Sequence, residues 1–336
     1  MGRTDCVRAN ESTQANDDHA RHDMPPAKAP SRGGYMTSNS KPSVGTIAAL
    51  WRFPVKSMIG EQLQEMDVTD AGVLGDRAYA LIEADTGKVV SAKSIKLFPD
   101  LLRCKAEFVE APIRGSEVPP VRITLPTGLS VRSDAGNVDQ VLSEYFHRSV
   151  KLARGAPENF TIDQYHPDIE GADPGGNRDA VVEQKLGAAL FAVIGAPSPV
   201  PQGSFLDVFP VSVMTTSTLA RLNELAPQSR FDARRFRMNV IIQTHQEGFV
   251  ENAWVGLELA LGSSVRLNVA LLDPRCVMTT LAQDDLPQDM EVLRTLVRHN
   301  RVQLPGLGQF PCAGAYAVVS NQGSVHVGDL VCADAR

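Results

Sequence analysis

The stretch LELALGSSVRLNVAL, residues 257–271, decides the fold class. Two short apolar runs, Leu257–Leu261 and Val265–Leu271, flank the turn signal Gly262-Ser263-Ser264. Short runs rich in Leu and Val around a Gly/Ser turn are typical of consecutive β-strands. The stretch therefore predicts a strand, a turn and a second strand.

The same pattern recurs along most of the chain, with few helical segments between. Further strands are predicted at Ile47–Phe53, Met66–Thr69, Ala78–Glu83, Val121–Leu125, Leu129–Arg132, Phe205–Met214, Val240–Gln243, Tyr316–Ser320 and Ser324–Val327. Hairpin turns are expected at Asp85–Lys88, Pro126–Gly128 and Asn321–Gly323, and helices at Val138–Phe146, at Ser217–Leu225 with Ser217 or Thr218 as its cap, and from Pro287 onward. Many short strands predict a mostly β, α+β fold with a β-barrel. The absence of regular βα alternation and of GxGxxG argues against a dinucleotide-binding sheet.

The composition and charge of the chain argue against several classes of function. The 336 residues carry 33 Lys and Arg against 39 Asp and Glu, a net charge of −6, which argues against nucleic-acid binding. There is no apolar run of membrane-spanning length and no secretory signal, so no membrane contact is expected. The five scattered cysteines include no CxxC pair, which argues against a disulfide framework or zinc finger and favours a reducing, cytoplasmic location. Residues 1–43 contain no Leu, Ile, Phe or Trp and are predicted to be a disordered tail.

One candidate for chemistry is the cysteine in PRCVMTT, residues 274–280. Cys276 follows Arg275 at the end of a predicted strand, and a neighbouring arginine favours the thiolate form. Thiolates are nucleophiles and soft ligands for transition metals. The alternative interpretation is a buried, inert cysteine.

Anion-binding side chains form a second candidate group. Arg234, Arg235 and Arg237 precede Asn239, and arginine forks bind phosphate or carboxylate in a bidentate manner. Lys56 and Arg77 also stand at strand ends, although a solvated basic surface would explain any of these residues. Asp207 is a charge within an apolar run, so it is either paired and buried or directed at a polar ligand. The sequence has no HExxH, GxSxG or Walker motif, which argues against zincins, serine hydrolases and P-loop enzymes.

Several motifs, in this order, resemble the MOSC family, named for the C-terminal domain of molybdenum-cofactor sulfurases. They are Trp51–Ser57 with Gly75-Asp76-Arg77, Arg235–Asn239, Glu251–Gly256, Arg275–Thr280 and Gly328-Asp329. The first two resemble the N-terminal β-barrel domain that accompanies MOSC. The resemblance extends over about residues 44–333, and it implies an N-terminal β-barrel-like domain at 44–150 and a MOSC domain at 151–336.

The arrangement is similar to the amidoxime-reducing members of the family, which implies a molybdenum-dependent enzyme that reduces N-hydroxylated compounds. The resemblance places the metal ligand, and thus the catalytic residue, at Cys276. It places contacts to the pterin molybdenum cofactor at Lys56, Ser57, Arg77, Asp207, Arg237, Asn239 and Arg275. Met238 and Pro274 depart from the family pattern, and Pro274 puts one cofactor hydrogen bond in question.

The resemblance also implies partners and leaves alternatives open. Electrons would come from a separate protein, either a ferredoxin or a cytochrome b5-like protein with its reductase. The family is also associated with pyridoxal phosphate binding. Alternative functions are a sulfur carrier with a persulfide on Cys276, serving metal–sulfur cluster or cofactor maturation, and a non-catalytic cofactor-binding protein.

Overall fold

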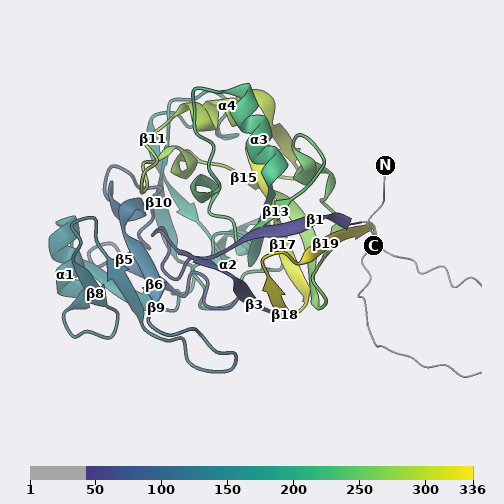
Figure 1. The fold of residues 1–336 in the computed structure, drawn as a ribbon. Coiled ribbons are helices and arrows are strands. Elements are labelled where there is room, and N and C mark those ends of the chain that lie inside the picture. The colour runs from purple at the N-terminus through teal and green to yellow at the C-terminus, as the bar shows by residue number, and fades with distance from the viewer. Residues whose placement is uncertain (1–42, 336) are drawn as a thin grey trace, which may run out of the picture.

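The computed structural model describes residues 43–335, and a closed barrel of seven strands dominates it (Figure 1). The barrel strands, in spatial order, are β12 (Val211–Thr215), β13 (Val240–Gln243), β1 (Ser43–Arg52), β19 (Leu330–Ala335), β14 (Leu257–Leu261), β15 (Val265–Pro274) and β17 (Gly308–Asn321). Pairing of β17 with β12 closes the ring. Neighbouring barrel strands are antiparallel except β12 and β13. The prediction of a mostly β fold with a barrel is confirmed.

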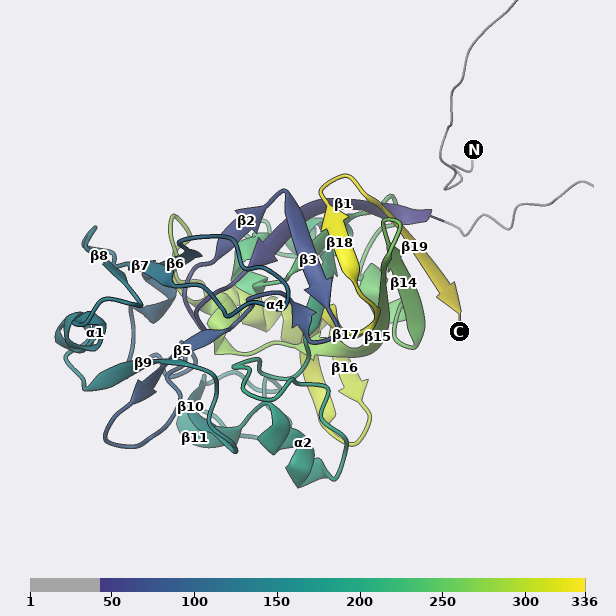
Figure 2. The ribbon, with the colours of Figure 1, turned by 90° about the horizontal axis from the view of Figure 1, so that it is seen from below.

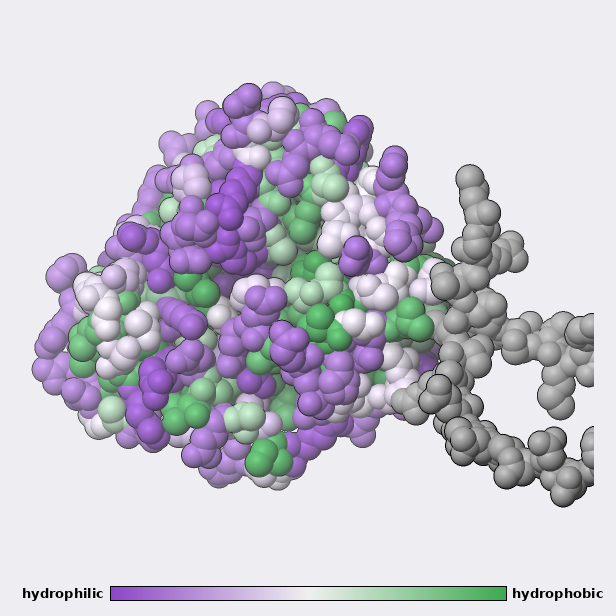
Figure 3. All heavy atoms as spheres, in the orientation of Figure 1, coloured by the Kyte–Doolittle hydropathy of each residue, from purple (hydrophilic) through white to green (hydrophobic). Residues whose placement is uncertain are grey.

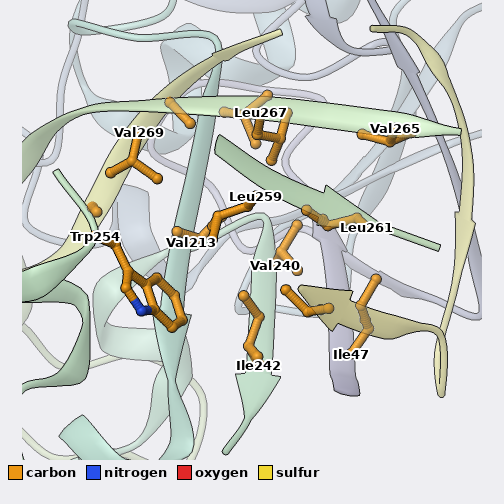
Figure 4. Packing of buried hydrophobic residues seen from close by; sticks show 14 of the residues in the cluster. Ile47, Val213, Val240, Ile242, Trp254, Leu259, Leu261, Val265, Leu267 and Val269 are labelled. Atoms are coloured by element: carbon orange, nitrogen blue, oxygen red, sulfur yellow. The ribbon is translucent and has the colours of Figure 1, made fainter. Parts of the chain in front are cut away.

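Alternating side chains of the barrel strands fill its interior (Figure 4). Leu259 and Leu261 of β14 face inward, as do Val265, Leu267 and Val269 of β15, and all five are buried. This period of two follows from the pleat of a strand, which sends successive side chains to opposite faces. Each such burial stabilises the fold by about 1.5–3 kcal/mol, so the stretch at 257–271 anchors the barrel core.

A second group of elements packs around its own core, away from β19 (Figures 1 and 2). It contains β5 (Tyr79–Glu83) paired with β9 (Val150–Arg154), the sheet β6 (Lys105–Phe108), β7 (Val121–Thr124) and β8 (Ser130–Arg132), and helix α1 (Val138–Phe146). The bounds of α1 match the predicted helix, and the hairpin of β7 and β8 is also as predicted. Leu142 of α1 and Ile123 of β7 are fully buried in this core.

The first described strands lie against strands from the C-terminal part of the chain. β1 pairs with β13 and β19, and β3 (Glu65–Thr69) pairs with β18 (Gly323–His326) and β4 (Gly72–Val73). The predicted hairpin of β17 and β18 is therefore wrong. The reason is that β17 already pairs with β15 and β12, so β18 leaves the barrel and completes the sheet of β3. The division of the chain at residue 150 stays a prediction.

A predicted strand at Phe205–Met214 forms only in its second part, as β12. Residues 205–210 are irregular because Pro210 has no N–H for a strand ladder and because other segments use the backbone there. The Phe205 N–H donates to the carbonyl of Arg77 at 3.2 Å, and the Asp207 carbonyl accepts the Gly187 N–H at 2.7 Å. This irregular course leaves the Asp207 side chain free to line a cavity.

Two predicted helix starts also need correction. Helix α3 (Thr216–Leu225) is capped by Thr215, whose hydroxyl oxygen accepts the Thr218 N–H at 3.2 Å, and not by Ser217 or Thr218. Helix α4 (Glu291–His299) begins after Asp289, whose Oδ1 accepts the Glu291 N–H at 2.9 Å. Pro287 does not open it, because its carbonyl accepts an Arg235 guanidinium hydrogen bond at 2.8 Å.

The remaining elements cover the barrel and connect its strands. They are β2 (Glu61–Leu63), β10 (Thr161–His166), β11 (Ala180–Lys185), β16 (Arg301–Leu304), helix α2 (Ala188–Ile194) and the 3-10 turns Leu101–Arg103, Ala233–Phe236, Val250–Ala253 and Val277–Thr280. Hydrophilic residues predominate on the face in Figure 3, with hydrophobic ones in small groups. Within residues 43–335, no helix combines the length and apolar character needed to cross a membrane. The predicted tail lies outside the described residues, except Ser43, which begins β1.

Candidate functional site

All eight predicted site residues line one cavity, here called the first cavity. They come from five separate segments of the chain. The eight are Lys56, Ser57, Arg77, Asp207, Arg237, Asn239, Arg275 and Cys276. The fold therefore brings together side chains that are up to 220 positions apart in the chain.

Three of these residues hold a left-handed backbone conformation. The φ angles are 64° at Ser57, 46° at Arg77 and 56° at Arg237, and positive φ is uncommon for residues other than glycine. Such conformations persist where the surrounding structure enforces them, and they cluster at functional sites. Here the Arg77 N–H donates to the Phe53 carbonyl at 2.7 Å, and its guanidinium donates to the Arg237 carbonyl at 3.1 Å.

Arg237 is a buried cation without a carboxylate partner. Its guanidinium carbon lies 4.3 Å from the centre of the Phe53 ring, and that of Arg77 lies 4.4 Å from the same ring. Arg77 is balanced by Asp76, but no carboxylate within residues 43–335 lies within ion-pair distance of Arg237. Burial, together with the charge of Arg77, lowers the pKa of Arg237 to about 9. An anion in the cavity would supply the missing negative charge.

Two buried polar atoms of the site also lack hydrogen-bond partners among residues 43–335. Arg237 Nη1 donates to the Met58 carbonyl at 2.7 Å, but within this range Nη2 has no acceptor and the Ser57 hydroxyl has no partner. A buried polar group without a partner costs about 1–3 kcal/mol, so such groups call for a ligand. An unsatisfied guanidinium beside a hydroxyl fits a phosphate group.

Asp207 lies between two lysines at the other side of the first cavity. Lys56 and Lys93 both bind its carboxylate, Lys93 Nζ at 2.7 Å from Oδ2. Burial alone would raise the pKa of Asp207, but the two lysines outweigh it and hold that pKa well below its usual range. Burial lowers the pKa of Lys56. Burial also acts to lower the pKa of Lys93, but the negative charges of Asp207 and Cys276 outweigh it, so the pKa of Lys93 is raised. The carboxylate thus fixes both ammonium groups in place.

The side chains of Arg275 and Asn239 line the first cavity, and their polar atoms already bind other groups of the protein. Arg275 Nε donates to the Ala313 carbonyl at 2.8 Å, and its Nη2 lies 2.7 Å from Asp273 Oδ2. Asn239 Oδ1 accepts the Ser212 N–H at 3.1 Å, and Nδ2 donates to Asp76 Oδ2 at 3.0 Å. Both residues hold neighbouring walls of the cavity together.

Cys276 is half-buried between β15 and the 3-10 turn Val277–Thr280, and it lines two adjoining cavities. Two other cysteines, Cys104 and Cys312, are fully buried, and burial raises the pKa of each thiol to about 12. Those two thiols therefore stay protonated at neutral pH. Within residues 43–335, no group of three His, Cys, Asp or Glu side chains is placed to hold a metal ion.

Some sequence motifs build the fold rather than the cavity. In Glu251–Gly256, the buried Glu251 carboxylate accepts hydrogen bonds from the Thr215 N–H and the Thr218 hydroxyl, and so it supports the start of α3. The Gly328 N–H donates to the Ile47 carbonyl at 2.8 Å and ties the last turn to β1. Arg235 lines the first cavity, but its buried side chain also donates to the Pro287 carbonyl at 2.8 Å and so holds the segment after Cys276.

Sequence reasoning missed several polar residues of the first cavity, among them Lys93, Asp273 and Tyr316. Lys93 stands among the small residues Ser91, Ala92 and Ser94, with no cluster to mark it. Asp273 lies next to the PRC stretch, and a charge at the end of an apolar strand was the signal that could have found it. Tyr316 donates a hydrogen bond to Asp273, so these two and Arg275 form one buried polar group.

Asp273 is expected to make stability depend on pH. Burial raises its pKa from 3.8 to about 6, although Arg275 and Tyr316 oppose the shift. Between about pH 4 and 6 the folded state therefore binds more protons than the unfolded state, so this group's contribution to stability falls as pH rises through that window. Chemical denaturation of the wild type and Asp273→Asn across this range should show a difference in unfolding free energy that changes with pH. A difference in unfolding free energy that stays constant with pH would contradict the raised pKa of Asp273.

Comparisons with known proteins match two domain families and several curated relatives. The family model of the MOSC N-terminal beta barrel domain matches residues 44–145, and that of the MOSC domain matches residues 201–332. Mitochondrial amidoxime reducing component 2 from Macaca fascicularis is 27% identical over 86% of this chain and 83% of its own length. The Homo sapiens component 2 is 26% identical over the same shares, and Homo sapiens component 1 is 24% identical over 86% of this chain and 82% of its own. The chain belongs to the MOSC-domain family and combines the MOSC N-terminal β-barrel domain with the MOSC domain.

Proposed function

We propose that this chain binds a pterin molybdenum cofactor in the first cavity and reduces N-hydroxylated compounds. The observation that carries the proposal is the pairing of an unsatisfied buried anion site, Arg237 Nη2 and Ser57 Oγ, with Cys276 on the same cavity wall. The MOSC family and the amidoxime-reducing relatives support a function related to the molybdenum cofactor. The cavity residues fit that group because its phosphate needs cations and hydrogen-bond donors, and its metal accepts a thiolate.

Different residues of the first cavity would bind different parts of the cofactor. Arg237 and Ser57 would bind the phosphate, and Arg77 would add positive charge beside it. Lys56 and Lys93, fixed by Asp207, would bind polar groups of the pterin. Asn239 and Arg275 would act as positioning residues, because their donors and acceptors already bind the protein.

The thiolate of Cys276 would ligate the metal, and the bound cofactor would supply the two-electron reduction of the N–O bond. In the overall reaction, an N–OH group takes up two electrons and two protons, the N–O bond breaks, and an N–H compound and water are released. The electrons would come from a separate ferredoxin or cytochrome b5-like protein with its reductase. This donor, a cytoplasmic location and pyridoxal phosphate binding remain predictions.

Metal analysis together with turnover tests the proposal. Protein made in a host that synthesises the cofactor is expected to contain stoichiometric molybdenum and pterin, and to convert benzamidoxime to benzamidine with an artificial reductant. Cyanide-labile sulfur without molybdenum would instead favour a sulfur carrier with a persulfide on Cys276. Bound molybdenum and pterin without turnover would favour a non-catalytic cofactor-binding protein.

A further inference from the structure

A second cavity adjoins the first and shares Cys276, Arg275 and Lys93 with it, among other residues. Part of its wall is formed by the end of β10 and by the loop that follows it, residues 167–179. Apolar side chains line one part of it: Leu186, Val208, Leu293 and Phe310. It does not include Arg237 or Ser57, so the unsatisfied anion site lies outside it.

Asp173 gives this second cavity an unbalanced negative charge. The side chain is only 14% exposed, and its Oδ2 accepts hydrogen bonds from the Asn177 N–H at 3.0 Å and Nδ2 at 2.7 Å. The structure places no lysine or arginine of residues 43–335 within ion-pair distance of it. The two cations of the shared wall are already bound, Lys93 by Asp207 and Arg275 by Asp273.

His166 is the ionisable group nearest to this carboxylate, and it does not neutralise it. His166 Nδ1 lies 3.7 Å from Asp173 Oδ1, beyond hydrogen-bond distance, and the imidazole is buried. Burial lowers the pKa of His166 despite the opposing effect of Asp173, so the ring is neutral near pH 7. A largely buried carboxylate without a neighbouring cation is unfavourable, and a ligand that brings a positive charge reduces that cost.

We propose that the second cavity holds the organic body of the substrate, and that Asp173 selects N-hydroxylated compounds carrying an ammonium, amidinium or guanidinium group. The apolar side chains would contact the body of such a molecule, while its N–OH group lies toward Cys276. The reduction step rests on the proposed function, whereas cation binding by Asp173 does not.

The kinetic test compares two substrates that differ in charge. Asp173→Asn is expected to lower kcat/KM for 4-(aminomethyl)benzamidoxime on the order of tenfold, chiefly through KM, because it removes a charge-assisted hydrogen bond. For neutral benzamidoxime the change should stay within about twofold. Asp168→Asn is the matched control, since Asp168 lies on the same loop but is exposed and pairs with Arg178 at 2.7 Å. Equal losses for both substrates would overturn the proposal.

A binding test needs no turnover. Calorimetry on the purified wild-type holoprotein should show benzamidine binding at least about tenfold more tightly than its neutral analogue benzamide. The same preference should disappear in Asp173→Asn. Equal affinity for the two probes in the wild type would overturn the inference, even if the variant failed to fold. A protein that prefers benzamidine to benzamide but reduces neither benzamidoxime nor 4-(aminomethyl)benzamidoxime would support the cation site and contradict the proposed function.

Discussion

Replacing Cys276 with serine is expected to abolish reduction of benzamidoxime while the chain stays folded. A serine alkoxide is a harder and more basic ligand than a thiolate, so the metal would lose its protein ligand. Mutation of a residue that only hydrogen-bonds to a metal ligand already lowers activity or metal affinity about ten- to a hundredfold. Loss of the ligand itself should therefore lower activity more than about a hundredfold. The residue is half-buried, so the free energy of unfolding should change by only about 0.5 kcal/mol.

The measurement is turnover with an artificial reductant, beside thermal melting and pterin fluorescence. Because other residues would hold the phosphate, the organic cofactor should largely remain bound in Cys276→Ser. Cys104→Ala and Cys312→Ala are matched controls, since both thiols are buried, line neither cavity and stay protonated. Each should cost about 1–3 kcal/mol of stability and keep turnover per folded molecule. An active, molybdenum-loaded Cys276→Ser protein would contradict the assignment.

Local structure was predictable wherever the apolar pattern was strong. The bounds of α1, β13 and β14 match the predicted segments, and β15 extends the predicted strand to Pro274. These segments are specified by nearby side chains: a strand by alternation, a helix by apolar residues at helical spacing. Such patterns state which side of an element is buried, and they carry no information on its partner.

Strand partners were for that reason the weakest part of the prediction. β1 pairs with β13 and β19, which lie far along the chain, and β18 pairs with β3 rather than with the adjacent β17. Proximity in sequence favours a hairpin, but the closed barrel gives β17 neighbours on both sides. Barrel closure is a property of the whole sheet, and no short window of sequence shows it.

Much of the lining of the first cavity could be named from the sequence, but its arrangement could not. The eight candidate site residues all line this cavity, whereas Arg234 of the same arginine group does not. Lys93 escaped because a single lysine among small residues looks like a surface residue until Asp207 is seen beside it. Asp173 and His166 escaped because they belong to no recognised spacing, and only the course of the loop at 167–179 brings them into a cavity.

Replacing Arg237 with alanine is expected to empty the first cavity of cofactor without unfolding the chain. The buried guanidinium has one unsatisfied donor and no carboxylate partner among the described residues, so its charge is available to an anion. Loss of charge-assisted hydrogen bonds worth about 2–3 kcal/mol would weaken cofactor binding roughly 30- to 150-fold. Molybdenum content and pterin fluorescence of the purified variant measure this loss.

The stability of the cofactor-free protein separates this role from a structural one. Arg237→Ala gives up the hydrogen bond to Met58 and the contact with Phe53, but it also removes a buried, unbalanced charge. These effects oppose each other, so the free energy of unfolding should change by no more than about 1 kcal/mol. Arg234→Ala is the matched control, because it removes the same charge from the same segment, where Asp232, Asp284 and Asp285 bind that guanidinium. Its cofactor content should equal that of the wild type, and full occupancy in an inactive Arg237→Ala would show that Arg237 serves the reaction in another way.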